Sequence, residues 1–244
     1  MTPADLLERA VATVTPVPKL TDSIALDVPA AYQVQREVIG RRLNRGERLA
    51  GVKMGFTSRA KMIQMGVDDL IWGLLTDAML VQDTLDTSAL IHPRIEPEIA
   101  FRIGSEVRAP SDVDRAVDGV AVGFEVLDSR YSDFKFTLPD VIADNASAAF
   151  FGTGTWHAPR DVANIGLIME FDGRVVCTGS SAAILGDPYR SLRAAARLAA
   201  AAGITLEPGF VVLAGAATAA LPLPPHAHVR VTGSGLGAAE VRTR

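Results

Sequence analysis

The sequence predicts an α+β fold in which a small N-terminal α/β region precedes a larger, mostly β core. Three observations lead to this prediction. Two helical patterns with clear starting signals occur before residue 46, strand-like runs dominate after about residue 90, and one clear helix interrupts those strands. We therefore expect an N-terminal α/β region over residues 1–90 and a β-rich core over residues 91–244 that carries the functional site.

The predicted helices have recognisable ends. Thr2 is a suitable N-cap for a helix over residues 3–14, whose first position is a proline. A second helix over residues 29–45 also opens on a proline, places its apolar residues at helical spacing and is followed by glycine. Asp187 caps a third helix, over residues 189–202, which a glycine closes. These helices account for most of the helical content that we expect.

Strand-like runs follow one another through the second part of the chain. They lie at residues 95–103, 119–127, 166–171, 174–178, 209–214, 227–232 and 236–243. Asp172-Gly173 separates two of these runs and is a strong signal for a two-residue β-hairpin. The core is therefore expected to be mostly β.

Composition excludes several classes of function. The 244 residues carry a formal net charge of -4 without a basic cluster, which argues against nucleic acid and anionic membrane surfaces as partners. No run reaches the roughly 18 apolar residues of a membrane span, and the N-terminus lacks a signal-peptide pattern. Cys177 is the only cysteine, so no intramolecular disulfide can form, which suits a reducing compartment. We expect a cytoplasmic protein that binds a small molecule.

Two glutamates interrupt an otherwise apolar strand pattern. In the run RIEPEIAF, at residues 94–101, apolar residues alternate with Glu96 and Glu98. Strand geometry points both carboxylates to one face, where like charges this close need a proton or a cation. For two glutamates alone, a solvated face paired with Arg94 and Arg102 is the simpler interpretation.

A third carboxylate favours a metal site. Glu125 also lies in an apolar run, where an unpaired charge is costly. Three carboxylates that converge from two strands form a hard-oxygen site suited to Mg²⁺ or Mn²⁺. Asp128 is the rival ligand to Glu125, but regular strand alternation turns it to the opposite face. We therefore expect Asp128 to hold Arg130 or a backbone amide instead.

A lysine between two glycines is the next candidate. Lys53 lies in the run GVKMGFTS, at residues 51–58, where glycine permits close backbone approach. Thr57 or Ser58 begins a predicted short helix that ends near Gly66, and helix N-termini bind carboxylates. A strand-to-helix turn with an exposed lysine explains these residues equally well. The chain has no phosphate-loop pattern, no G-x-S-x-G motif and no metalloprotease histidine spacing.

Taken together, these motifs resemble the fumarylacetoacetate hydrolase superfamily in its hydratase/decarboxylase branch. The similar segments are GVKMGFTSRAKMIQMGV (51–67), RIEPEIAF (94–101), FEVLDSRYSDFKF (124–136), PDVIADNAS (139–147) and AGAATAALPL (214–223). The resemblance covers nearly the whole chain. Within the branch, the KMG form around Lys53 and the DSRY-x-x-FKF form at 128–136 are more similar to the decarboxylases than to the hydratases.

The resemblance implies a mixed β-rich core of the fumarylacetoacetate hydrolase type and a divalent ion, Mg²⁺ or Mn²⁺. The metal ligands that it implies are three carboxylates, Glu96, Glu98 and Glu125. The polar pair that it places nearest the reacting carbons is Lys53 and Asp77. The substrate contacts that it implies are two serines, Ser58 and Ser147.

The resemblance also implies an activity. This is metal-dependent decarboxylation of 2-oxohex-3-enedioate (4-oxalocrotonate), a small 2-oxo diacid, to 2-hydroxypenta-2,4-dienoate and CO₂ in the meta-cleavage degradation of aromatic compounds. The alternative within the branch is hydration of that dienoate, as in a 2-oxopent-4-enoate hydratase, and a second alternative is a non-catalytic partner subunit of such a hydratase. The expected partners are further copies of the chain in a homo-oligomer and a 2-oxopent-4-enoate hydratase in a complex.

Overall fold

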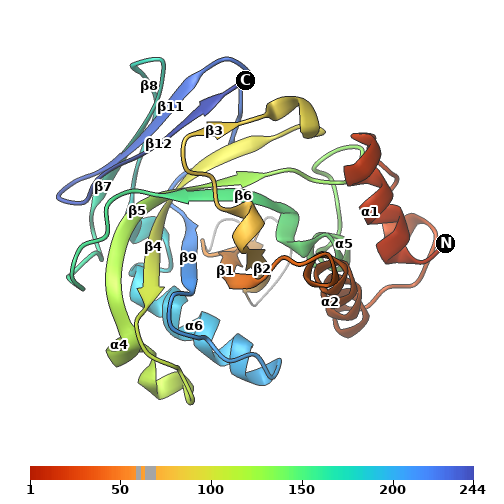
Figure 1. The fold of residues 1–244 in the computed structure, drawn as a ribbon, viewed down its shortest axis with the longest axis horizontal. Helices are drawn as coiled ribbons and strands as arrows, with labels where there is room; N and C mark the ends of the chain where they lie inside the picture. Colours follow the sequence, from red (N-terminus) through yellow and green to blue (C-terminus); the bar gives the residue numbers. More distant parts are fainter. Residues whose placement is uncertain (59–61, 64–69) are drawn as a thin grey trace.

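The structure, a computed structural model, describes residues 1–58, 62–63 and 70–244. Two β-sheets and a set of mostly peripheral helices build it, in agreement with the predicted α+β class (Figure 1). Most of the short helix expected between Thr57 or Ser58 and Gly66 lies outside the described residues. None of the helices that the structure does describe combines the length and apolar character of a membrane span.

The larger sheet joins strands from both parts of the chain. Its strands are β1 (Leu49–Gly55), β2 (Ile71–Thr76), β4 (Arg94–Ile103), β5 (Val117–Leu127), β6 (Ala148–Thr153), β9 (Val211–Ala216) and β10 (Leu221–Pro222). Their order is β2-β1-β9-β4-β5-β6, with β10 paired to β4. β1 and β9 are parallel, and the other pairs are antiparallel. Because β9 lies between β1 and β4, strands from both sides of residue 90 belong to one sheet.

The smaller sheet packs on one part of the larger one. Its order is β3 (Thr84–Leu85), β12 (Gly237–Thr243), β11 (His228–Gly233), β7 (Gly166–Phe171) and β8 (Arg174–Ser180). Asp172 and Gly173 join β7 to β8 with φ angles of 50° and 76°, so the predicted hairpin is confirmed. β11 and β12 contact β5, and β12 also contacts β6 (Figure 1).

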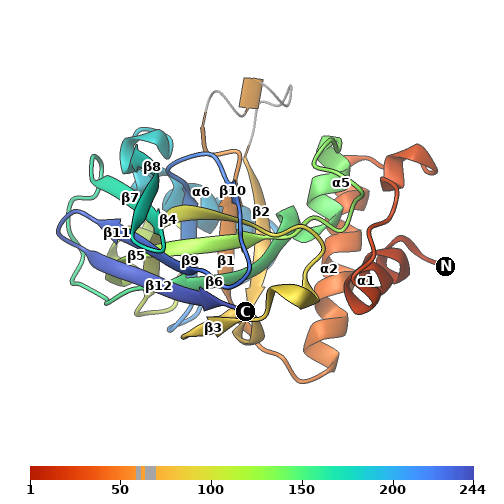
Figure 2. The same cartoon turned by 90° about the horizontal axis from the view of Figure 1, so that it is seen from above.

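Five of the α-helices lie in two groups. The first group is α1 (Pro3–Thr13), α2 (Val28–Asn44) and α5 (Leu138–Ala143), which gather beside one end of the larger sheet (Figure 2). The second group is α4 (Val113–Ala116) and α6 (Pro188–Ala201), and α6 packs on β9 and β1. Short 3₁₀ turns are η1 (Leu20–Asp22), η2 (Asp77–Met79), η3 (Thr87–Ala89), η4 (Pro110–Asp112), η5 (Asn145–Ser147) and η6 (Ser181–Ala183). The three predicted helices are therefore confirmed as α1, α2 and α6.

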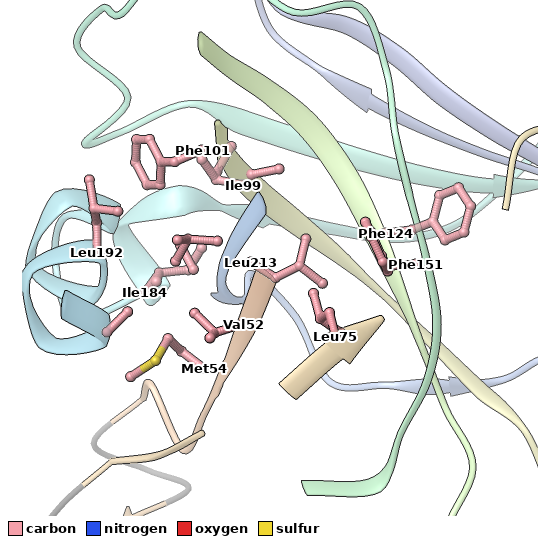
Figure 3. Packing of buried hydrophobic residues seen from close by; sticks show 14 of the residues in the cluster. Val52, Met54, Leu75, Ile99, Phe101, Phe124, Phe151, Ile184, Leu192 and Leu213 are labelled. Atoms are coloured by element: carbon pink, nitrogen blue, oxygen red, sulfur yellow. The ribbon is translucent and has the colours of Figure 1, made fainter. Parts of the chain in front are cut away.

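Strand alternation divides the side chains of the larger sheet between two faces. Val52 and Met54 lie in the apolar core beside α6 (Figure 3), so Lys53 between them turns to the opposite face. Ile99 on β4 belongs to the same apolar core, and its neighbour Glu98 turns the other way. The polar residues of β1 and β4 consequently meet on the face of the sheet that α6 does not cover.

Candidate metal centre

Glu96, Glu98 and Glu125 form a buried cluster. In the register of β4 and β5, Glu96 stands directly opposite Glu125, and Glu98 stands opposite Gly123. Each glutamate offers one carboxylate oxygen, and these oxygens lie within 4.8 Å of one another. The three side chains belong to residues only 4%, 0% and 0% exposed. The structure therefore brings together the three carboxylates that the sequence selected.

The cluster is chemically suited to a cation. Burial raises the pKa of Glu98 well above its usual value, and the negative charges of Glu125 and Glu96 raise it further. The Gly215 N–H donates to Glu98 Oε2 at 2.5 Å, but Glu98 Oε1 is buried with no hydrogen-bond partner among the described residues. An oxygen left in this way is costly unless a ligand satisfies it. An all-oxygen, multiply anionic donor set fits a hard divalent ion.

Lys53 places a positive charge beside these carboxylates. Its Nζ lies 3.1 Å from Glu125 Oε1 and donates to the Ala146 carbonyl at 3.0 Å. The residue is 3% exposed, so the interpretation as an exposed lysine in a turn is wrong. Three carboxylates this close repel one another when ionised, and a bound cation relieves that repulsion.

Ala146 belongs to a strained turn that the sequence did not reveal. Asn145, Ala146 and Ser147 have φ angles of 52°, 52° and 58°, a region that residues other than glycine rarely adopt. The Asn145 side chain holds this turn to β2, because its Oδ1 accepts from Leu74 N at 2.8 Å and its Nδ2 donates to Leu74 O at 2.9 Å. The turn directs the Ala146 carbonyl toward Lys53. The tolerance of asparagine for positive φ was the only available sequence signal.

The two predicted substrate serines lie in different surroundings. Ser147 is buried and lines a cavity of about 340 Å³, and Lys53 and Glu96 line the same cavity. Its hydroxyl donates to Asp144 Oδ2 at 3.3 Å. Ser58 is half-buried and follows Thr57, a buried residue that also lines the cavity. Ser147 therefore faces the proposed ligand site directly, whereas Ser58 lies next to its wall.

Asp77 is the predicted site residue that the structure does not bring to the cluster. The β1–β2 register places Lys53 opposite Gly73, so Asp77 lies beyond the far end of β2. There it is exposed, and its Oδ1 accepts from the backbone N–H groups of Arg48 and Ala78 at 2.9 Å each. In this position Asp77 caps a surface turn, away from the glutamate cluster.

Asp128 and Arg130 belong to a second buried set of charges. As expected, the Asp128 carboxylate accepts from backbone amides, those of Ile91 and His92, at distances down to 2.8 Å. Arg130 Nε and Nη2 donate to the side chain and the carbonyl of Asp144. Arg130 Nη1 donates to the Asp128 carbonyl at 2.7 Å. These contacts connect the end of β5 to the strained turn.

Comparison with known proteins agrees with this arrangement. The chain is 50% identical over 246 residues to a 4-oxalocrotonate decarboxylase from Pseudomonas sp. That alignment covers 98% of this chain and 96% of the relative. It is 37% identical over 194 residues to a 2-hydroxypent-2,4-dienoate hydratase from Pseudomonas putida. This second alignment covers 75% of this chain and 87% of the relative. No protein-family model matches the chain.

A solved structure shows the same fold over almost the full length. The 4-oxalocrotonate decarboxylase from Pseudomonas putida G7, complexed with magnesium and adipate, aligns with a TM-score of 0.94 and 38% identity. The alignment covers 99% of this chain and 96% of that chain. Both alignments extend over nearly the whole of this chain. The chain belongs to the family of 4-oxalocrotonate decarboxylases and related hydratases, the hydratase/decarboxylase branch of the fumarylacetoacetate hydrolase superfamily.

Proposed function

We propose that the protein is a metal-dependent carboxy-lyase that converts 2-oxohex-3-enedioate to 2-hydroxypenta-2,4-dienoate and CO₂. The observation that carries this proposal is the buried glutamate cluster beside Lys53, in a chain that is 50% identical to a relative named 4-oxalocrotonate decarboxylase. The hydratase relative is more distant, at 37% identity. This difference favours decarboxylation over hydration.

Glu96, Glu98 and Glu125 would hold the divalent ion, which we propose to be Mg²⁺ or Mn²⁺. When bound, the ion supplies Lewis acidity for the 2-oxo oxygen and the adjacent carboxylate of the substrate. The Gly215 N–H fixes one oxygen of Glu98, and the pairing of β4 with β5 fixes Glu96 against Glu125. The protein therefore presents these ligands in a preformed geometry.

The bond changes of the reaction place demands on the rest of the cavity. The electron pair of the bond to the leaving carboxyl group becomes a new carbon–carbon double bond. The original double bond shifts by one position, and the 2-oxo oxygen gains a pair and then a proton. Lys53 lines the cavity with an ammonium group held between Glu125 and Ala146. We assign to Lys53 the donation of a hydrogen bond or proton to the reacting part of the substrate.

The cavity walls are suited to the loss of CO₂. Most lining residues besides the polar groups already described are apolar, among them Ile71, Leu127 and Val141. An apolar wall strengthens the electrostatic interactions of the polar groups with a bound substrate.

The two activities are separated by following two products. We expect the purified protein with Mg²⁺ to release CO₂ from 2-oxohex-3-enedioate, and to form little 4-hydroxy-2-oxopentanoate from 2-hydroxypenta-2,4-dienoate. Chelation with EDTA should abolish CO₂ release, and added metal should restore it. Hydration without decarboxylation would establish the second candidate, the hydratase. Absence of both activities in folded, metal-loaded protein would instead support the non-catalytic partner.

We further propose that the protein acts in the cytoplasm as a homo-oligomer, in a complex with a 2-oxopent-4-enoate hydratase. The proposed product of the decarboxylase is the dienoate on which such a hydratase acts. A complex would pass this reactive enol directly to the next enzyme. Co-purification of the two proteins, with light scattering to measure mass, tests the association.

A further inference from the structure

We propose that Arg94 binds the carboxylate at the far end of the substrate and so selects diacids over monoacids. The proposal rests on the proposed function for the chemical class of the substrate. Arg94 is the first residue of β4 and precedes Glu96 by two positions, so both side chains project from the same face of the strand. Both residues line the cavity of about 340 Å³. The cavity thus has an anionic part and, beside it, a cationic part.

The guanidinium of Arg94 is available to a ligand. Over the part of the chain that the structure describes, its only recorded interaction is with an aromatic ring, and no hydrogen bond or ion pair engages it. Lys53, the other cation among the described residues that line the cavity, is already engaged by Glu125 and the Ala146 carbonyl. A half-buried arginine without an anionic partner is costly unless a ligand pairs with it. Arg94 is therefore a better anchor for a substrate carboxylate than Lys53.

Aromatic residues hold the Arg94 side chain in place. Its Cζ lies 4.3 Å from the centre of the Phe134 ring, a stacking distance for a guanidinium. Phe134 in turn lies 5.0 Å from the His92 ring and 6.1 Å from the Phe136 ring. Stacking engages the face of the guanidinium and leaves its edge free. That edge carries the N–H groups that bind a carboxylate in bidentate fashion.

The spacing of the two charged parts suits a six-carbon 2-oxo diacid. Positions 94 and 96 of a strand are about 6.6 Å apart along the chain. In 2-oxohex-3-enedioate, four carbon–carbon bonds separate the 2-oxo carbon from the carbon of the far carboxylate. A substrate whose 2-oxo end lies at the glutamate cluster can therefore extend its far carboxylate toward Arg94. The hydratase substrate has no carboxylate at that end.

The chemistry of the leaving group defines what Arg94 contributes. A guanidinium binds the carboxylate before the bond breaks, but it gains little from neutral CO₂ afterwards. Arg94 should therefore strengthen binding without accelerating bond cleavage. Its removal is expected to raise KM far more than it lowers kcat, which separates this role from that of Lys53.

The test uses two unreactive ligands of equal length, 2-oxoadipate and 2-oxohexanoate, which differ only in the far carboxylate. Their dissociation constants are measured by calorimetry on Mg²⁺-loaded protein. The wild type should prefer 2-oxoadipate, and Arg94→Gln should lower this preference by about tenfold to a hundredfold while binding 2-oxohexanoate normally. Arg94→Lys keeps the charge but loses the planar fork, so it should retain part of the preference.

Arg102 supplies the matched control. It lies on the same strand and stacks on Trp156 at 5.2 Å, but it pairs with Asp118 at 2.7 Å and does not line the cavity. Arg102→Gln should leave the preference unchanged. Normal binding of 2-oxohexanoate by Arg94→Gln shows that this variant is folded. If Arg94→Gln fails to fold, the preference of Arg94→Lys against that of wild type decides the question.

Three results would overturn the inference. They are a wild type without preference for the diacid, an Arg94→Gln variant that keeps the full preference, and an Arg94→Lys variant identical to wild type when Arg94→Gln does not fold. The measurement needs no turnover. If Arg94→Gln loses the preference but wild type releases no CO₂, the role of Arg94 is supported and the proposed reaction is contradicted. If wild type releases CO₂ but Arg94→Gln keeps the full preference, the reaction is supported and the role of Arg94 is contradicted.

Discussion

Two buried sets of charges flank the strained turn at residues 145–147, and they differ in how completely the protein satisfies them. In the arginine cluster, the Arg130 guanidinium donates to the Asp144 side chain and to several backbone carbonyls. In the glutamate cluster of Glu96, Glu98 and Glu125, like charges face each other and Glu98 Oε1 has no hydrogen-bond partner among the described residues.

The difference separates a structural role from a binding role. Buried charges that are fully paired hold elements together, because breaking the pair leaves an uncompensated charge. Buried charges of one sign repel one another and raise the free energy of the metal-free protein. A bound cation removes this repulsion and lowers the free energy again. Lys53 joins the two sets, since it contacts Glu125 in one and the turn held by the other.

The largest effect is expected for Lys53→Met, which keeps the length of the side chain and removes its charge. We expect kcat for CO₂ release to fall by roughly 10²–10⁴-fold, the usual range for loss of a general acid. Magnesium affinity should not fall, because a protonated lysine cannot act as a metal ligand. Asp77→Asn is the control, and its kcat should match wild type because Asp77 lies at the surface. An effect on KM alone would make Lys53 a binding residue.

Arg130→Met tests the structural side of the comparison. We expect the free energy of unfolding to fall by about 3–5 kcal/mol, because Asp144 would stay buried without its guanidinium partner. Urea denaturation followed by circular dichroism measures this loss. A variant within about 1 kcal/mol of wild type would show that the arginine cluster does not hold the fold together.

Glu98→Gln tests the binding side. The amide oxygen can still accept from Gly215 N–H, but the negative charge is lost. Changes to residues behind metal ligands already cost about 10–100-fold in affinity, so magnesium affinity should fall by at least about 100-fold. The metal-free variant should be about as stable as wild type, because a neutral amide replaces a carboxyl group whose raised pKa already favours its neutral form. Large destabilisation without loss of metal affinity would reverse the roles of the two clusters.

The pH dependence of metal binding is the smallest of these effects. The pKa of Glu98 lies well above its usual value in the metal-free protein, so a proton must leave before or as the metal binds. Affinity should therefore fall as the pH drops, by up to about tenfold per pH unit while that proton is bound. Calorimetry in buffers of different ionisation enthalpy counts the released protons. Glu98→Gln should show a flatter profile.

The sequence predicted the parts of the site that depend on local periodicity. Alternation along RIEPEIAF placed Glu96 and Glu98 on one face, and the structure agrees with that placement. The same reasoning assigned Asp128 to Arg130 or a backbone amide, and its carboxylate accepts from the His92 amide. Both inferences need only the period of a strand, which the order of residues contains.

The parts that the sequence did not reveal depend on contacts between distant segments. Asp77 follows Lys53 in the chain, but only the β1–β2 register shows that it lies at the opposite end of the hairpin. β2 itself was not predicted, because its short apolar run resembles any buried segment. The Asn145 turn was also missed, since its conformation is held by hydrogen bonds to Leu74.

The position of β9 between β1 and β4 has a consequence for synthesis of the chain. Lys53 and the glutamates are made early, but the strand that joins β1 to β4 spans Val211–Ala216. The amide that fixes Glu98 belongs to Gly215 in that same strand. During synthesis on the ribosome, Lys53 on β1 and the glutamates on β4 and β5 therefore cannot come together until β9 has emerged, near the end of the chain. A chain that ends before β9 should accordingly bind metal more weakly than the full chain, because the Gly215 amide that fixes Glu98 is missing.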